Sequence, residues 1–291
     1  MSESVRSYYA GLGEREWARL TTPSGAIEFA VNTHALEDHL PPGARVLDIG
    51  GGPARYALWL AERGHRVTLA DLSPELLAIA RREVAQSPYG AQVEEIVKAD
   101  ARDLSRWGDG SFDATLSLGP FYHLPDAEDR ERAAGELARV LCPGGLAFVA
   151  SMTRYSFLRR TAAIRDERHH LTQPAFVARL MEDGVFINDV PGRFTDGYGA
   201  HPQEIAPFFE RHGFETVELL ASEGIAWGIQ DALAEMSADE AQAYQVMLEL
   251  VLRTANDPSI LGASDHLLYV GRKVDQASRG RSRLAAAREA R

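Results

Sequence analysis

A glycine-rich turn between an apolar segment and a helical one is the feature of the sequence best able to do chemistry. The string VLDIGGGPAR, residues 46–55, places three glycines after an apolar run that carries one acid, Asp48. Glycines tolerate positive φ and let a ligand approach the backbone closely. A second acid, Asp71, follows Gly52 by 19 residues and ends another apolar run, where a carboxylate can accept hydrogen bonds from ribose hydroxyls. The alternative is a structural tight turn with an exposed aspartate, and the turn alone does not separate the two.

The spacing of these glycines argues against a nicotinamide or flavin dinucleotide. A dinucleotide fingerprint has the form G-x-G-x-x-G, and its third glycine would fall on Arg55. Arginine at that position would block the close packing of helix on strand. Asp48 would also repel a pyrophosphate, whereas its carboxylate can attract a cation. The turn therefore favours a ligand that carries positive charge.

Short apolar runs that alternate with helical patterns must position this turn. Ser73 and Pro74 give the helix after the second run an N-cap and a first-turn proline. Strands that alternate with helices at this spacing indicate βαβ units and a parallel sheet covered on both faces, and right-handed crossovers make it doubly wound. Ligands of such a sheet bind at the carboxyl ends of its strands. We expect strands at 45–49, 66–71, 92–98, 112–117, 146–151, 215–220 and 266–271, and helices at 53–63, from 73, at 125–141, at 203–212 and within 229–254.

Composition limits the partners of the chain. It has 291 residues, 31 Lys and Arg against 42 Asp and Glu, and a formal net charge of −11. This acidity argues against broad binding to nucleic acid or to an anionic membrane. One cysteine, Cys142, excludes an intrachain disulfide and a multi-cysteine metal site. No apolar run approaches about 18 residues, and the first residues lack the apolar stretch of a signal peptide. We therefore expect a cytoplasmic protein with a small-molecule partner, without nucleic-acid or membrane partners, as a monomer or a homodimer.

On these residues the chain resembles a class I S-adenosylmethionine-dependent methyltransferase. The first motif of that family is an apolar strand, an acid and then x-G-x-G-x-G; Asp48, Gly50 and Gly52 match it, and Ala54 replaces the third glycine. The matching motifs run in order from about residue 45 to residue 151. The resemblance implies an α/β fold, a doubly wound Rossmann-like mixed sheet of seven strands with an antiparallel last strand and helical lid insertions. It also implies S-adenosyl-L-methionine as the cofactor.

The resemblance further assigns residues to the cofactor. Asp71 would hold the ribose hydroxyls, Leu72 would lie beside the adenine, and Asp100 would accept from the adenine amino group with the backbone of Ala101 next to it. The loop at 117–123 would face the transferred methyl group. The cofactor-binding residues expected in all are Asp48, Gly50, Gly52, Asp71, Leu72, Asp100, Ala101, Leu118, Tyr8 and Tyr9.

Two residues on the loop after the fourth strand are the candidate catalytic residues. Methyl transfer needs the nucleophile, methyl carbon and sulfur held in line, and it needs a base only when the nucleophile carries a proton of high pKa. His123 could take that proton, or it could pack beside the cofactor. Tyr122 is the better candidate for a pocket wall. Neither Asn-Pro-Pro-Tyr nor Pro-Cys follows the fourth strand, so the resemblance does not extend to methylation of nucleic-acid bases.

Two segments outside the core are candidate lids. Tyr8 and Tyr9 could stack over the cofactor and exclude water, or their segment could be an amphipathic helix that packs on the core. Arginines in the insertion at 152–202 could clamp a substrate carboxylate, although Arg159, Arg160, Arg165 and Arg168 are expected to form a solvated helix face with Asp166 and Glu167. The expected substrate-binding residues are Arg154, His169, Tyr198, His201 and Trp227. His266, near the last strand, could also line the acceptor pocket, and Trp227 could equally be a core residue.

No metal site is expected. His169 and His170 are adjacent, which does not fit one helix face, and no acid near them in the sequence completes a site.

The parts of the chain can be assigned in order. We expect N-terminal lid helices at 1–40, the cofactor-binding core at 41–151, a substrate lid at 152–202, the rest of the core sheet with a helical insertion at 203–274, and a flexible basic tail at 275–291. The expected function is methyl transfer to an oxygen or nitrogen of a small metabolite. The alternative is a regulatory or partner protein that binds S-adenosylmethionine without methyl transfer.

Overall fold

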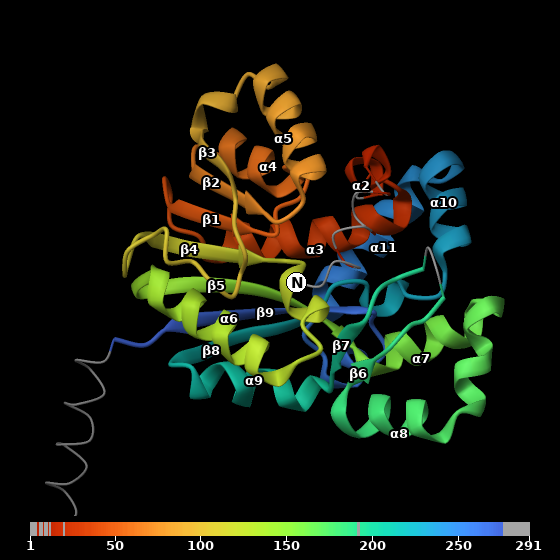
Figure 1. Ribbon diagram of the computed structural model, residues 1–291. Helices are drawn as coiled ribbons and strands as arrows, with labels where there is room; N and C mark the ends of the chain where they lie inside the picture. The colour runs from red at the N-terminus through yellow and green to blue at the C-terminus, as the bar shows by residue number, and fades with distance from the viewer. Residues whose placement is uncertain are drawn as a thin grey trace, which may run out of the picture.

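A computed structural model describes residues 13–19, 21–190 and 193–275, together with Val5, Tyr8 and Gly11 (Figure 1). Tyr9 and the arginines of the C-terminal tail lie outside the described residues. No helix among the described residues is long and apolar enough to cross a membrane.

One mixed sheet forms the centre of the molecule. Its seven main strands run in the order β3-β2-β1-β4-β5-β9-β8. The first five are parallel to one another, while β9 is antiparallel to both β5 and β8. The short strand β7 also pairs with the end of β5, and β6 pairs with β7. The strands are β1 Arg45–Ile49, β2 Arg66–Asp71, β3 Val93–Lys98, β4 Phe112–Ser117, β5 Leu141–Thr153, β6 Val185–Phe186, β7 Gly197–Ala200, β8 Phe214–Ala221 and β9 His266–Lys273.

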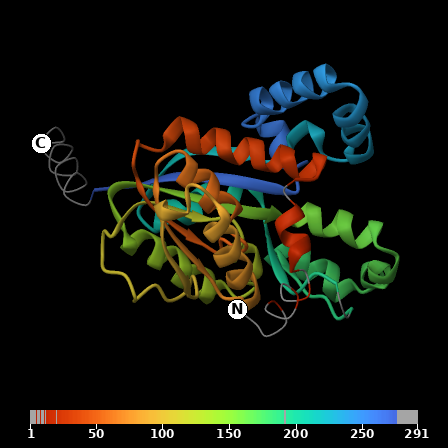
Figure 2. The same ribbon diagram turned by 90° about the horizontal axis from the view of Figure 1, so that it is seen from above.

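Helices cover both faces of the sheet (Figures 1 and 2). One apolar cluster joins α3, α4, α5, α10 and α11 to one face, and a second joins α6 and α9 to the other. The helices are α2 Glu14–Arg19, α3 Pro23–His39, α4 Arg55–Glu62, α5 Pro74–Gln86, α6 Ala127–Val140, α7 Arg154–Ala163, α8 Pro174–Asp183, α9 Pro202–Arg211, α10 Gln230–Asp239, α11 Ala241–Thr254 and α12 Pro258–Leu261. The 3-10 helices are η1 Gly90–Gln92, η2 Pro120–His123, η3 Arg165–Thr172 and η4 Gly224–Ala226.

Alternation along the central strands explains the two clusters. On β5, Leu146 and Phe148 belong to one cluster, whereas Ala147 and Val149 belong to the other. Successive side chains of a strand point to opposite faces, so a strand covered on both faces is apolar throughout. The expected doubly wound α/β fold, its seven-stranded core and its antiparallel last strand are confirmed.

The insertion after β5 is more ordered than the sequence indicates. Helices α7 and α8 and strands β6 and β7 form a lobe beside the sheet (Figure 1). Phe157, Phe176, Leu180 and Phe186 make a third apolar cluster there, together with Tyr122 of η2. Because Tyr122 also faces the cleft described below, this lobe is packed directly against the candidate site.

The expectation of one solvated helix face in this insertion is wrong for Arg159 and Arg160, whereas Arg165, Asp166 and Arg168 are exposed as expected. Helix α7 ends at Ala163, so the arginines at 165 and 168 belong to η3 and not to the helix of Arg159 and Arg160. Arg159 pairs with Asp265 on the loop before β9 at 2.7 Å. Arg160 pairs at 2.9 Å with Glu167, which is fully buried. A buried carboxylate needs such a partner. Arg159 and Arg160 therefore connect α7 to the loop before β9 and to η3.

Candidate cofactor cleft

A cleft with about 810 Å³ of empty space, partly open to solvent, lies at the carboxyl ends of β1, β2 and β4. Its walls come from the turn at 50–53, the end of β2, the start of α5 and the loop at 118–123. Glu16 of α2 and Glu28 of α3 also line the cleft.

The turn after β1 requires glycine at its first positions. Gly50 has φ +77°, and its N–H donates to the carbonyl of Ala70 at 2.7 Å. A Cβ on Gly50 would lie 2.6 Å from Cδ of Pro120, and one on Gly51 would lie 2.6 Å from Oδ2 of Asp48. The bare backbone of this turn thus lets the strand ends and the loop after β4 approach one another around the cleft.

Ala54, at the third glycine position of the motif, has a left-handed backbone. Its φ is +81° and its side chain is fully buried. Among the described residues it is the only non-glycine residue with positive φ. An L-residue in this conformation costs about 1–2 kcal/mol. The departure from the motif is therefore compatible with the packing but strains the backbone.

Replacing Ala54 by glycine is expected to raise the free energy of unfolding by about 1 kcal/mol, because it removes this strain. Ala57, in the interior of α4, provides the matched control. Ala57→Gly should lower the free energy of unfolding by about 1 kcal/mol or more, since glycine is unfavourable within a helix. Urea unfolding of the three proteins measures both values, and a loss of stability in Ala54→Gly would contradict the strain.

Two buried carboxylates flank the turn. Asp71 Oδ2 accepts from the N–H of Gly52 at 2.9 Å, and its Oδ1 accepts from the N–H of Ser73 at 2.8 Å. Burial raises the pKa of Asp71, and these backbone N–H groups act in the opposite direction. Asp48 is 1% exposed, and its Oδ2 has no hydrogen-bond partner among the described residues. Burial, and secondly the charge of Asp71, raises the pKa of Asp48 to about 7. A buried, unsatisfied carboxylate oxygen in the wall of a cleft is suited to a ligand with positive charge.

Without ligand, Asp48 should make stability depend on pH. An aspartate of the unfolded chain titrates near 3.9. Because the pKa is higher in the folded protein, the contribution of Asp48 to stability is full below about pH 4 and is lost as the pH rises towards 7. Asp48→Asn removes the titration, so its free energy of unfolding relative to wild type should rise by a few kcal/mol between pH 4 and pH 8. Urea unfolding at several pH values measures this difference. The exposed Asp38→Asn variant should show little change, and a pH-independent difference for Asp48→Asn would contradict the raised pKa.

The loop after β4 places both candidate catalytic residues at the cleft. Leu118, Tyr122 and His123 all line it. His123 is 3% exposed, and burial lowers its pKa to about 3. Its ring stacks on Phe194 with a centroid distance of 5.0 Å, and its Nδ1 lies 3.3 Å from Oγ1 of Thr195. A histidine with so low a pKa is neutral at pH 7 but accepts a proton weakly.

Part of the expected cofactor set lies elsewhere. Leu72, Asp100 and Ala101 are not among the described residues that line the cleft. Arg102 binds both carboxylate oxygens of Asp100, with Nη2 to Oδ2 at 2.6 Å and Nε to Oδ1 at 3.0 Å. Tyr8 packs against Phe194 with ring centroids 5.7 Å apart, so it reaches the lobe beside His123. The cofactor roles of all four residues remain predictions.

The five expected substrate residues do not meet at the cleft. Arg154 is 5% exposed and donates to the carbonyl of Met181 at 2.7 Å, so it connects α7 with α8. Tyr198 carries the guanidinium of Arg130 on its ring at 3.6 Å. His201 caps α9, and its backbone N–H donates to Glu204, the acid to which Arg154 and Tyr198 also donate. Trp227 stacks with Arg159, and His169 lies on η3. None of the five is among the described residues that line the cleft.

Two glutamates beside the cleft, Glu28 and Glu223, were not found from the sequence, whereas His266 was a candidate for the wall of the acceptor pocket. Glu223 Oε1 lies 2.6 Å from Nδ1 of His266. Its Oε2 accepts from Oγ of Ser264 at 2.7 Å and from the N–H of His266 at 2.8 Å. Glu28 of the cleft wall offers a carboxylate oxygen within 4.8 Å of ligand atoms on both Glu223 and His266. The ring of His266 also contacts that of Tyr122, with centroids 5.8 Å apart. The position of both residues relative to the strands could have indicated the pair. Glu223 follows β8 and His266 begins β9, which is antiparallel to β8, so both lie at the edge of the sheet where the ligand binds.

The sequence of the segment that forms the cleft is similar to those of known methyltransferases. Residues 47–149 match the family described as "Methyltransferase domain". A ubiquinone biosynthesis O-methyltransferase of Xanthomonas axonopodis pv. citri is 34% identical over 145 residues, which are 50% of this chain and 55% of that protein. The chain thus matches about half the length of that relative. An uncharacterized protein of Mycobacterium tuberculosis is 30% identical over 231 residues, covering 74% of this chain and 81% of that one.

A solved structure extends the likeness of the fold over nearly the whole chain. The 1,6-didemethyltoxoflavin-N1-methyltransferase of Burkholderia thailandensis, solved with 1,6-didemethyltoxoflavin and S-adenosylhomocysteine, is 20% identical with a TM-score of 0.54. The match covers 94% of this chain and 88% of that one. Residues 47–149 thus form a methyltransferase domain, and the fold of the chain is that of the compared methyltransferase.

Proposed function

We propose that this enzyme transfers a methyl group to an oxygen or nitrogen of a small molecule, and that the Glu223–His266 pair removes the acceptor proton. The observation that carries the proposal is the position of this pair beside the cleft, in contact with Tyr122. The cofactor in this proposal is S-adenosylmethionine, which when bound supplies an electrophilic methyl group attached to a sulfonium. A hydroxyl or protonated amine acceptor then needs a nearby base.

The cleft residues have complementary roles in this proposal. The unsatisfied carboxylate of Asp48 faces the cationic part of the cofactor. Asp71, which fixes the turn at Gly52 and the start of α5, holds the ribose hydroxyls. Leu118 and Tyr122 form apolar walls, which keep water from the reacting atoms.

His266 is better suited than His123 to act as the base. The Nδ1–H of His266 donates to Glu223, which fixes the tautomer and leaves Nε2 as the proton acceptor. Nε2 takes the proton of the acceptor, and the imidazolium that forms is stabilised by the glutamate. His123 remains the alternative base, but its burial and its pKa of about 3 favour the packing role beside Phe194.

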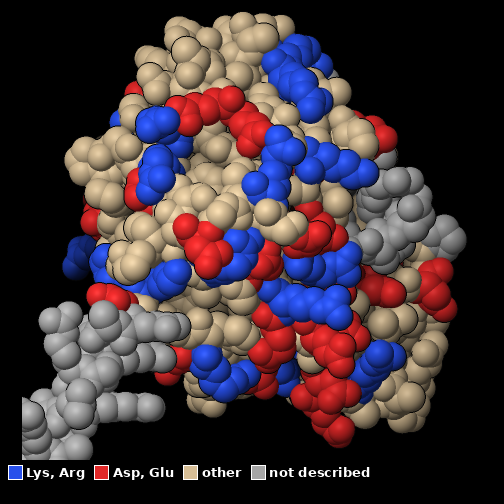
Figure 3. Space-filling model, turned by 60° about the vertical axis from the view of Figure 1, so that its left-hand side comes forward, with Lys and Arg blue, Asp and Glu red and all other residues tan. Residues whose placement is uncertain are grey.

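The surface supports a small acceptor over a polyanion. Figure 3 shows Lys and Arg interspersed with Asp and Glu over the face that it presents. Several described arginines are paired with acids, as Arg102 is with Asp129 at 2.6 Å and Arg139 with Glu136 at 2.7 Å. Such pairs leave little positive charge to neutralise phosphates. The names of the compared enzymes, one an O-methyltransferase and one an N-methyltransferase, support oxygen or nitrogen as the acceptor atom.

A methyl-transfer assay tests the proposal. The protein is incubated with S-adenosylmethionine labelled in its methyl group and with a metabolite extract, fractionated into phenols, amines and carboxylates. We expect label in a phenol or amine fraction, and mass spectrometry then identifies the product. Cofactor binding measured in the same preparation, with no labelled product in any fraction, would overturn methyl transfer to a small molecule.

A further inference from the structure

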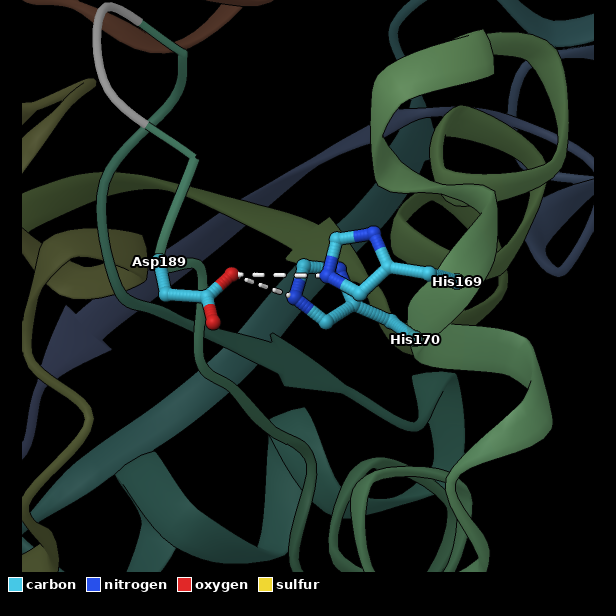
Figure 4. Close-up of side chains that lie close together, drawn as sticks. All are labelled: His169, His170 and Asp189. Carbon is cyan, nitrogen blue, oxygen red and sulfur yellow. Dashed lines mark hydrogen bonds and ion pairs between the residues drawn. The ribbon is translucent and has the colours of Figure 1, made fainter.

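Two adjacent histidines on η3 face one carboxylate on the loop that follows β6 (Figure 4). The Oδ1 atom of Asp189 lies 2.8 Å from Nε2 of His170 and 3.6 Å from Nε2 of His169. Ligand atoms of all three residues lie within 4.8 Å of one another. The expectation that no acid joins this histidine pair is therefore wrong, because Asp189, 19 residues further along the chain than His170, reaches both rings.

These distances suit the coordination sphere of a first-row divalent ion. Zinc binds imidazole nitrogens and carboxylate oxygens at about 2.0–2.2 Å, which places neighbouring ligand atoms of a tetrahedral site about 3.3 Å apart. The two distances from Asp189, 2.8 and 3.6 Å, lie on either side of this value. Two imidazoles and one carboxylate are also a known catalytic zinc ligand set, with a fourth position left open.

The surroundings of the two rings support coordination through Nε2. The Nδ1 of His169 lies 2.9 Å from the carbonyl of Asp166, the backbone contact that orients many metal-bound histidines. The ring of His170 is stacked on Phe176 with centroids 4.9 Å apart. Metal ligation at Nε2 would place a proton on Nδ1 of His170, which is buried without a hydrogen-bond partner among the described residues. Glu167 lies one turn earlier on the same 3-10 helix. Its Oε2 atom is a buried acceptor that also has no hydrogen-bond partner among the described residues.

We infer that His169, His170 and Asp189 bind one divalent transition-metal ion of the zinc type. A shallow cavity lined by His170, Asp189, Gln173 and Arg179 opens beside the site. The open coordination position therefore has space for water or for an anionic ligand. This inference does not depend on the proposed methyl acceptor.

The ion would connect η3 to the loop that borders the cofactor cleft. Next to Asp189, Asn188 donates from its side chain to the carbonyl of Phe194 at 2.8 Å and from its backbone N–H to Asp196 at 3.0 Å. Phe194 stacks on His123, which lines the cleft. Metal binding would thus reduce the motion of the loop that covers His123.

Calorimetric titration of the metal-free, tag-free full chain with ZnCl₂ tests the site. We expect saturable binding of one ion per chain in wild type. His169→Ala and Asp189→Asn should weaken binding by more than about tenfold, since changes behind the ligands alone cost about 10–100-fold. Both side chains are half-exposed or exposed, so these variants should fold, which far-ultraviolet circular dichroism checks.

The control and a second measurement make the test decisive. His34 provides the control, because it lies 3.5 Å from an acid, Asp38, on an exposed helix face and does not belong to the proposed site. The variant His34→Ala should therefore bind zinc like wild type. Hydrogen exchange in a peptide spanning 185–198 should slow when zinc is added to wild type and should not slow in Asp189→Asn. The site would be overturned if wild type bound no stoichiometric zinc, or if His169→Ala and Asp189→Asn both bound zinc with the affinity of wild type.

Discussion

Replacing Asp71 by alanine is expected to abolish the thermal stabilisation that S-adenosylmethionine gives to the wild-type protein. The carboxylate accepts from the N–H groups of Gly52 and Ser73, so it holds the glycine turn against the start of α5. In the proposed site it also accepts from the ribose hydroxyls. Hydrogen bonds to a buried charged group contribute about 1.5–3 kcal/mol each. Loss of two such bonds lowers the cofactor affinity by about a hundredfold or more.

Thermal shift with increasing cofactor, supported by calorimetric affinity, measures this effect. Asp71→Asn keeps the size of the side chain and one acceptor oxygen, so it should retain part of the shift and separate ligand binding from support of the turn. Asp38→Ala, an exposed acid on α3, should shift like wild type. A full cofactor shift in Asp71→Ala would show that the carboxylate does not bind the cofactor.

His266→Ala is expected to reduce turnover about 10²–10⁴-fold, which is the usual contribution of a positioned general base. Cofactor affinity should change little, because His266 is not among the described residues that line the cofactor cleft. Glu223→Gln should have a smaller effect, since it leaves the imidazole in place but removes the charge that stabilises its protonated form. Turnover with the identified acceptor and cofactor affinity are measured on the same preparations.

The chain offers a matched control for this experiment. His39 pairs with Glu218 at 3.2 Å, a second histidine–glutamate pair that is not among the described residues lining the cleft. His39→Ala should retain wild-type turnover. If His123→Ala reduces turnover about 10²–10⁴-fold and His266→Ala does not, the base is His123 and the role given to His266 is wrong.

The core of the fold was predictable because local signals and tertiary structure agree there. The expected strands at 45–49, 66–71 and 112–117 coincide with β1, β2 and β4. Ser73 caps α5 as predicted, accepting from the N–H of Leu76. Such strands are buried on both faces and read as apolar runs bounded by turn residues. The glycine turn, Asp48 and Asp71 could be placed at the cleft for the same reason.

The lobe and the residue pairs beside the cleft could not be predicted in this way. Glu223 and His266 are separated by 43 residues, and they meet because β9 pairs antiparallel with β8, with Ala221 opposite Leu267. The histidines of η3 meet Asp189 through a loop without periodicity. Arg154 was expected to bind substrate because arginine suits anions, yet it is buried between α7 and α8. Long-range pairing and loop conformation decide these positions, and neither produces a local pattern.

The connection between β8 and β9 has a consequence for how the range of acceptors could evolve. Helices α10, α11 and α12 are all inserted between these strands, whereas Glu223 and His266 stand at the two strand ends where the insertion leaves and rejoins the sheet. Insertions and substitutions among those helices can reshape the surroundings of the pair while the strand register keeps the pair in place. Natural variation within this segment should therefore alter which molecule is methylated more readily than it alters the chemistry of transfer.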